Sequence, residues 1–173
     1  PDVVIGGRNS AGGSGGDLVV GSDNGDQLSG GNGADEIHGL AGPDEINGDM
    51  GSDVLTGGDG GDVLAGGRDS DVLVGGVGND TLSGGPGADV FRFDQTSGTE
   101  LGTDIITDFD SADGDVVELN VSDERTDLQT LLDTGRLVVN STTSGATVET
   151  NQVSIELPGV TDSADADDLI GLV

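Results

Sequence analysis

Aspartate recurs every nine residues through the first half of the chain, and this spacing has a direct chemical meaning. In nine consecutive nonapeptides the first residue is Gly and the sixth is Asp; the aspartates are Asp17, Asp26, Asp35, Asp44, Asp53, Asp62, Asp71, Asp80 and Asp89. Carboxylates and the carbonyls of glycine-rich loops are hard oxygen ligands. Calcium takes about six to eight such oxygens in a flexible geometry, whereas magnesium prefers a stricter octahedron. The pattern therefore predicts calcium sites.

The same repeat predicts the loops and strands that position these aspartates. Glycines at positions one, two and four are expected to take positive φ and turn their carbonyls inward without a Cβ clash. The first-position glycines are candidate carbonyl ligands: Gly12, Gly21, Gly30, Gly39, Gly48, Gly57, Gly66, Gly75 and Gly84. Positions six to nine read Asp, variable, apolar, variable, which is a short strand with one inward side chain.

If two nonapeptides make one turn of the roll, equivalent loops stack every 18 residues and the aspartates form two columns. One column is Asp17, Asp35, Asp53, Asp71 and Asp89, and the other is Asp26, Asp44, Asp62 and Asp80. One ion between each pair of neighbours gives about seven sites or more. Asp104 is expected to close a further site against Asp80, and Asp2 fits position six of an earlier repeat.

Other oxygen donors lie beside this pattern. Asp23, Asn32 and Asp59, at position three, either add ligands or face solvent. After the repeats, an acidic turn either holds another calcium ion or is solvated; its carboxylates are Asp110, Asp113 and Asp115.

Several residues replace glycine inside the loops. Asn24 and Asp69 stand at position four, where positive φ is tolerable for Asn and Asp. Leu40 and Asp49 stand at position two, where Asp49 adds a charge and Leu40 adds only bulk.

Several blocks match Gly-Gly-x-Gly-x-Asp-x-apolar-x, a known signature of calcium-binding β-helix repeats. They are GGNGADEIH (30–38), GGDGGDVLA (57–65), GGVGNDTLS (75–83) and GGPGADVFR (84–92). These blocks resemble the repeats-in-toxin (RTX) family, whose members are exported, calcium-loaded parallel β-rolls. The resemblance implies an all-β chain with a parallel β-roll, a two-sheet β-helix with stacked calcium sites, over residues 1–96. A small β-rich capping domain with one or two short helices is expected over 97–173.

The last part of the chain has its own signals. A capping box at Thr126–Gln129 predicts a short helix that ends at Gly135. Residues 136–141 and 146–150, around a turn at 144–145, predict a hairpin, and the alternation at 153–157 predicts a strand. The acidic and then apolar residues 168–173 resemble the uncleaved export signals of type I secretion substrates. The alternative is a final helix or strand that docks on the domain.

The charge of the chain indicates conditional folding. Five Arg and no Lys stand against 34 acidic residues, for a formal charge of −29, and there are only three Phe and no Trp or Tyr. Apolar burial is then insufficient to offset chain entropy and self-repulsion. We expect disorder without cations and folding with calcium. The charge sign argues against nucleic acid, no apolar stretch is long enough for membrane insertion, and a monomer is expected.

The sequence predicts no enzyme. His38 is the only His, and there is no Lys or Cys to supply a usual base or nucleophile. The overall layout resembles the C-terminal end of large bacterial biofilm adhesins, which implies the type I secretion machinery as partner and an extracellular or cell-surface location. One alternative is an accessory module of a secreted metalloprotease, lipase or alginate epimerase whose catalytic domain lies upstream. Another is a carbohydrate-binding or surface-binding acidic face.

Overall fold

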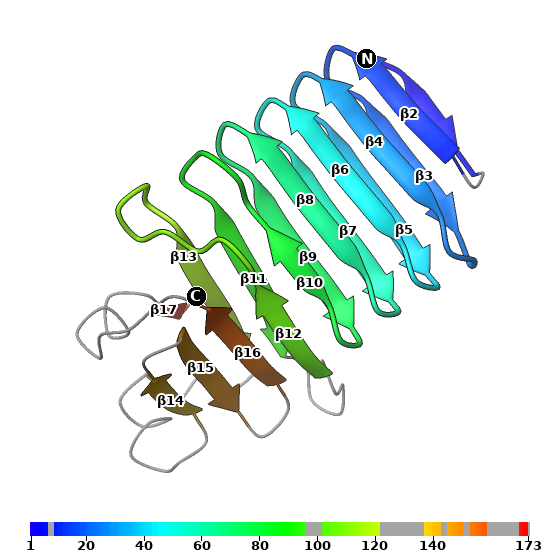
Figure 1. Ribbon diagram of the computed structural model, residues 1–173. Helices are drawn as coiled ribbons and strands as arrows, with labels where there is room; N and C mark the ends of the chain where they lie inside the picture. Colours follow the sequence, from blue (N-terminus) through cyan, green and yellow to red (C-terminus); the bar gives the residue numbers. More distant parts are fainter. Residues whose placement is uncertain are drawn as a thin grey trace.

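The computed structural model describes residues 1–6, 9–95, 102–121, 137–142, 145–150, 153–158 and 170–172. These residues form strands, turns and loops, with no helix among them. The chain coils as a flattened solenoid whose successive strands alternate between two sheets (Figure 1). Like residues in neighbouring turns are 18 apart, as expected for two nonapeptides per turn. The predicted parallel roll is confirmed.

Sheet A consists of parallel strands, and within the repeats they come from every second nonapeptide. Its order is β1 (Val3–Ile5), β3 (Leu18–Ser22), β5 (Glu36–Ala41), β7 (Val54–Asp59), β9 (Val72–Val77), β11 (Val90–Gln95), β13 (Val116–Val121) and β17 (Ile170–Leu172). Within the final apolar run of the sequence, Ile170–Leu172 form a strand that pairs in parallel with β13.

Sheet B takes the alternate strands and continues into an antiparallel extension. Its roll strands are β2 (Asn9–Ser14), β4 (Gln27–Asn32), β6 (Glu45–Met50), β8 (Val63–Arg68), β10 (Thr81–Ser83) and β12 (Gly102–Ile106). Beyond β12 lie β16 (Val153–Pro158), β15 (Gly145–Thr150) and β14 (Leu137–Thr142).

The tail confirms two of its predicted elements. Strands β14 and β15 pair as the expected antiparallel hairpin, and β16 is the expected strand. The helix expected after residue 126 lies outside the described residues. Both sheets continue across the expected boundary at residue 96, because β12 stacks on β10 and β13 stacks on β11.

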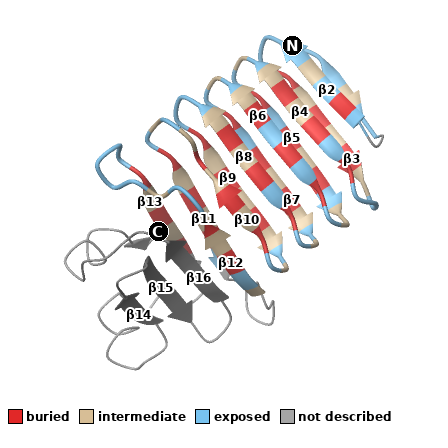
Figure 2. Ribbon diagram, viewed as in Figure 1, coloured by how far each residue is buried: buried red, intermediate tan, exposed pale blue. Residues whose placement is uncertain are grey.

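The core is a single ladder of apolar side chains between the sheets. Figure 2 shows buried residues alternating with more exposed ones along the strands of the roll. It contains the eighth residue of each repeat, at most 3% exposed: Val19, Leu28, Ile37, Ile46, Leu55, Leu64, Leu73, Leu82 and Phe91. Each strand contributes mainly one side chain per turn, so the apolar core is thin. Beyond the repeats Phe93 and Leu119 are also buried and add bulk at this end.

Within the described residues, no helix has the length and apolar character needed to span a membrane.

Candidate metal sites

The repeat aspartates stack in the two predicted columns. Each is at most 4% exposed, although carboxylates are normally surface groups. The backbone N–H of Asp35 donates to Oδ1 of Asp53 at 2.7 Å, and that of Asp53 donates to Oδ1 of Asp71 at 2.8 Å. In the other column the N–H of Asp44 donates to Oδ1 of Asp62 at 2.8 Å. Each carboxylate therefore lies between its own turn and the preceding one.

Three further aspartates extend the columns. The N–H of Asp80 donates to Oδ1 of Asp104 at 2.9 Å, as the sequence predicted. Asp2 donates its N–H to Oδ1 of Asp17, so its backbone occupies the expected register while its residue is exposed. The N–H of Asp89 donates to Oδ1 of Asp115 at 3.0 Å. Asp115, expected only as part of a turn, is the next column member.

Ten of the stacked aspartates each have one buried carboxylate oxygen that accepts no hydrogen bond within the described part of the chain. The orphaned atoms are Oδ2 of Asp17, Asp35, Asp44, Asp53, Asp62, Asp71, Asp80, Asp89 and Asp104, and Oδ1 of Asp26. A buried charged oxygen without a partner is strongly unfavourable, so each needs a cation or a proton. A repeated cation site meets this requirement.

The first-position glycines leave the space that these oxygens occupy. A Cβ on Gly12 would lie 2.8 Å from Oδ2 of Asp17 and 2.7 Å from the carbonyl oxygen of Gly30. None of the nine first-position glycines has positive φ, contrary to expectation. Glycine is needed there because a side chain would displace the carboxylate of the Asp five residues later and, at the first seven of these positions, also a carbonyl oxygen of the next turn.

Positions two and four do use the left-handed region. Gly31 and Gly33 have φ of 105° and 130°, and a Cβ on either would meet the carbonyl oxygen of the like residue one turn earlier. These carbonyls therefore face the gap between successive loops. Leu40, Asp49 and Asp69 adopt the same conformation, with φ of 84°, 75° and 75°. Asn24 is absent from the residues with positive φ, so the expectation for that loop was wrong.

Burial changes the protonation of the columns. It raises the pKa of Asp53 and Asp62 to about 6 and that of Asp71 and Asp104 to about 7. The N–H from the preceding turn acts in the opposite direction, while neighbouring column carboxylates raise these pKa values further. A divalent cation between two carboxylates would relieve both burial and repulsion.

The donor set fits calcium. No cluster of three or more His, Cys, Asp or Glu side chains occurs in the described residues. The gaps between turns instead present buried carboxylate oxygens and backbone carbonyls of the loops, a hard all-oxygen set of the kind calcium accepts. The third-position candidates Asp23, Asn32 and Asp59 are exposed to solvent and lie outside the columns.

The acidic turn after the repeats is arranged differently from the columns. Asp115 accepts the N–H of Asp89 at Oδ1 and the N–H of Asp110 at Oδ2, at 2.8 Å. Both of its oxygens therefore have protein partners, while Asp110 and Asp113 are exposed. This geometry favours a turn that is complete without metal.

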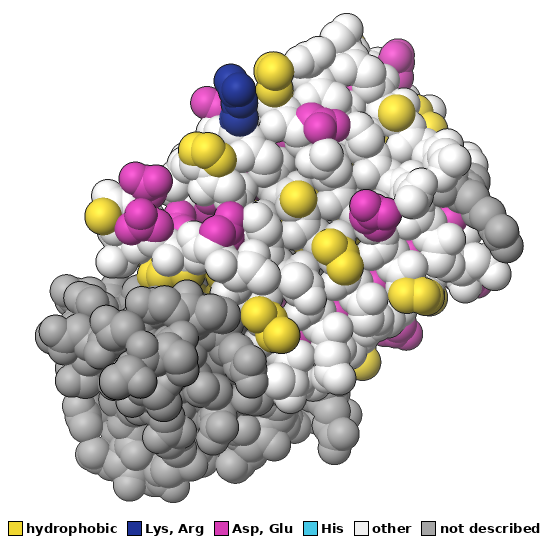
Figure 3. Space-filling view, in the orientation of Figure 1, with side chains coloured by type: hydrophobic (Ala, Val, Ile, Leu, Met, Phe, Trp, Pro, Cys, Tyr) yellow, Lys and Arg dark blue, Asp and Glu magenta, His cyan; other side chains and the backbone are white. Residues whose placement is uncertain are grey.

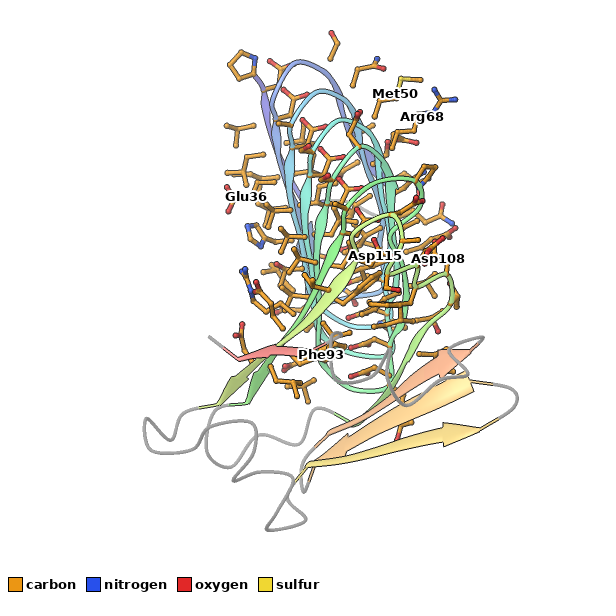
Figure 4. All side chains as sticks on the ribbon, turned by 90° about the vertical axis from the view of Figure 1, so that its left-hand side faces the viewer. Glu36, Met50, Arg68, Phe93, Asp108 and Asp115 are labelled. Carbon is orange, nitrogen blue, oxygen red and sulfur yellow. The ribbon has the colours of Figure 1, made fainter. Side chains whose placement is uncertain are left out.

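Asp108 makes inter-turn hydrogen bonds that the sequence did not predict. Its carboxylate accepts hydrogen bonds from Ser83 Oγ at 2.7 Å, Gly84 N at 3.0 Å and Gly85 N at 2.9 Å (Figure 4). The pairing of Ile106 with Leu82 places Asp108 at position one of the next loop. The alignment of Ile106 with Leu82 is the sequence signal that could have identified Asp108.

His38 lies away from the columns. Its Nε2 is 3.0 Å from Oε1 of Glu36 on the outer side of sheet A.

Buried carboxylates stacked between the turns of a parallel solenoid define a β-roll with inter-turn cation sites. The family model of the RTX calcium-binding nonapeptide repeat matches residues 11–46, 29–64 and 56–91. This part of the chain therefore belongs to the RTX family and is a calcium-binding module of the kind found in secreted proteins.

Similar solved structures include a secreted lipase and an epimerase subunit. The extracellular lipase LipA of Serratia marcescens is 14% identical, with a TM-score of 0.43, over 91% of this chain and 40% of the lipase chain. The AlgE6R3 subunit of the Azotobacter vinelandii mannuronan C5-epimerase is 26% identical, with a TM-score of 0.35, over 92% of this chain and 78% of that subunit. Both TM-scores are too low to establish a common overall arrangement. No curated protein matches the chain.

Proposed function

We propose that this chain is a calcium-dependent folding and secretion module at the C-terminal end of a large extracellular bacterial adhesin. The observation that carries the proposal is the set of ten buried carboxylate oxygens without partners. In a chain of formal charge −29, these columns oppose folding until cations fill the gaps. Calcium binding then becomes folding free energy by mass action.

The proposed extracellular location follows from the coupling of calcium binding to folding. A chain that needs calcium to fold stays unfolded where free calcium is scarce and folds where it is plentiful, so export precedes folding. We propose the type I secretion machinery as the partner in export, with residues 168–173 within its signal. The strands β14–β16 extend sheet B at one end and support a capping role, because the open end of a solenoid otherwise exposes unpaired backbone.

The module is proposed to have no catalysis of its own. Its single His interacts with Glu36 on the outer face, apart from the buried carboxylates. The alternative is that the module belongs to a secreted enzyme whose catalytic domain lies upstream. The sequence immediately before residue 1 separates the two: tandem immunoglobulin-like domains support an adhesin, whereas a zinc-protease helix motif or a hydrolase nucleophile motif supports an enzyme.

Far-UV circular dichroism during a calcium titration tests the proposal. A cooperative gain of β signal is expected between chelated protein and millimolar calcium, with no such gain in magnesium. A folded spectrum in chelator that calcium leaves unchanged would overturn the proposal, because the buried carboxylates would then be accommodated without a cation.

A further inference from the structure

The outer faces of the two sheets differ in polarity. On β3 to β11 of sheet A, the outward residues at position seven are Leu18, Glu36, Val54, Val72 and Val90. Those at position nine are Val20, His38, Thr56, Val74 and Arg92. These ten residues, here called the valine face, include six Val or Leu side chains.

Sheet B is mostly polar at the same positions. Its outward residues on β4 to β10 are Gln27, Ser29, Glu45, Asn47, Val63, Ala65, Thr81 and Ser83. Figure 3 shows this side, where hydrophobic side chains lie singly among other atoms. The apolar character of sheet A is therefore not a general property of the repeat.

The valine face carries one acidic residue, Glu36, and one basic residue, Arg92, whose formal charges cancel. Arg92 Nε lies 2.9 Å from Oε2 of Glu118, on the next strand, and His38 Nε2 lies 3.0 Å from Oε1 of Glu36. Figure 4 shows Glu36 projecting from this side of the roll. In a chain of formal charge −29, a face with so little net charge can approach a second copy without strong repulsion.

Leu40 adds a second observation on the same sheet. It is 47% exposed and has φ of 84°, a conformation unfavourable for a bulky residue. Its neighbours in register are Ser22 and Gly58, so a Leu is not required by the strand pairing. A strained, exposed apolar residue is the kind of position that an intermolecular contact explains.

We propose that two calcium-folded copies of this chain pack valine face to valine face, around a two-fold axis parallel to the strands and midway between β7 and β9. This rotation reverses the strand order, so β7 lies over β9 and β5 lies over β11 of the second copy. Glu36 then lies near the second copy's Arg92, while the Val54 and Val72 rows meet at the centre. The inference rests on the proposed calcium-dependent folding, and it revises the monomer expected from sequence.

The size of the face sets the strength of the contact. With this axis, β3 of each copy lies over β13 of the other, so six strands overlap. At about 4.8 Å spacing and six residues of about 3.3 Å each, they give roughly 570 Å² per copy. The two copies together bury about 1,100 Å², at the lower limit of specific interfaces. We therefore expect a dimer that dissociates in the micromolar range.

Sedimentation equilibrium in millimolar calcium tests the dimer directly. The 17.0 kDa chain is expected to double in mass as protein concentration rises through the micromolar range. A constant monomer mass at a few hundred micromolar, with a fully developed β signal, would overturn the dimer and leave the calcium-dependent fold intact. No β signal with calcium would instead refute the proposed function.

Two matched substitutions test the face. Val54→Glu and Val63→Glu change the same repeat position, on sheets A and B, at residues 40% and 50% exposed. Val54→Glu is expected to weaken the dimer about 100-fold, because two like charges meet near the axis, whereas Val63→Glu leaves it unchanged. Equal effects, or none, from both variants would overturn the assignment. If Val54→Glu lacks the calcium-induced β signal, Val54→Ser is tested with the same expected direction.

A charge reversal tests the orientation. Glu36→Arg places like charges near the second copy's Arg92 and is expected to weaken association about tenfold, whereas the sheet B control Glu45→Arg does not. An unchanged dimer in Glu36→Arg would refute the two-fold axis proposed here.

Discussion

Replacing Asp62 by Asn should raise the calcium concentration needed for folding. Asp62 Oδ1 accepts the N–H of Asp44 at 2.8 Å, and the Asp62 N–H donates to Oδ1 of Asp80 at 2.9 Å. The residue therefore borders two inter-turn gaps. Asn preserves the shape and one acceptor oxygen. It removes the charge and can place an amide donor where the buried Oδ2 lies.

The magnitude follows from mass action. An ion at about 100 times its dissociation constant stabilises the folded state by about 2.7 kcal/mol. Losing it from both gaps costs about 5 kcal/mol, which equals the whole stability of a marginal domain. The variant should be unfolded at calcium concentrations where the parent chain is folded.

The assay is the calcium midpoint of the far-UV β signal, with the ion count from calorimetry. Asp59→Asn in the same repeat is the matched control, because Asp59 is exposed and outside the columns. An unchanged midpoint for Asp62→Asn, or an equal shift for Asp59→Asn, would show that the columns do not hold the ions.

Three more predictions concern the loops, the columns and the core. Gly12→Ala should destabilise the calcium-loaded chain by about 3 kcal/mol, because the new Cβ meets oxygen atoms. The control Gly13→Ala places its Cβ in open space at φ of 108° and should cost only about 1–2 kcal/mol. Equal losses of stability in denaturant unfolding would refute this. In chelator, lowering the pH from about 8 to about 4 should increase the β signal. The folded-state pKa of Asp71 and Asp104 is raised to about 7, so their protonation stabilises the folded chain at low pH, and this stabilisation is lost as the pH rises through 7. An unchanged spectrum would contradict this. Leu64→Ala should lower the free energy of unfolding by about 2–5 kcal/mol, because it opens a cavity in a core that is one side chain wide. Denaturant unfolding in calcium measures this loss. A loss below about 1 kcal/mol would show that the turns collapse into the cavity.

The regular part of the structure was predictable because one period governs it. Asp at position six and an apolar residue at position eight repeat without a break, so the stacking interval, both columns and the buried ladder follow from spacing alone. Asp104 was also predictable, since the Asp and apolar pattern recurs around it and places it one turn beyond Asp80.

Elements outside the period were harder to predict. Asp115 joins its column 26 residues after Asp89, so an interval of 18 does not reach it. Its local signal is the pair Val116 and Val117 after the Asp, which copies positions six to eight. The role of the first-position glycines was misjudged because sequence shows only that a side chain is missing. Whether glycine provides backbone freedom or space depends on the neighbouring turn.

The 18-residue turn also gives the roll an unusual mechanical property. Each turn advances the solenoid by one strand spacing, about 4.8 Å, yet the same residues span about 60 Å when fully extended. A turn pulled out under tension would therefore lengthen about twelvefold. A few turns released one after another would add more than 100 Å of slack, and the array would act as a store of length that yields in steps.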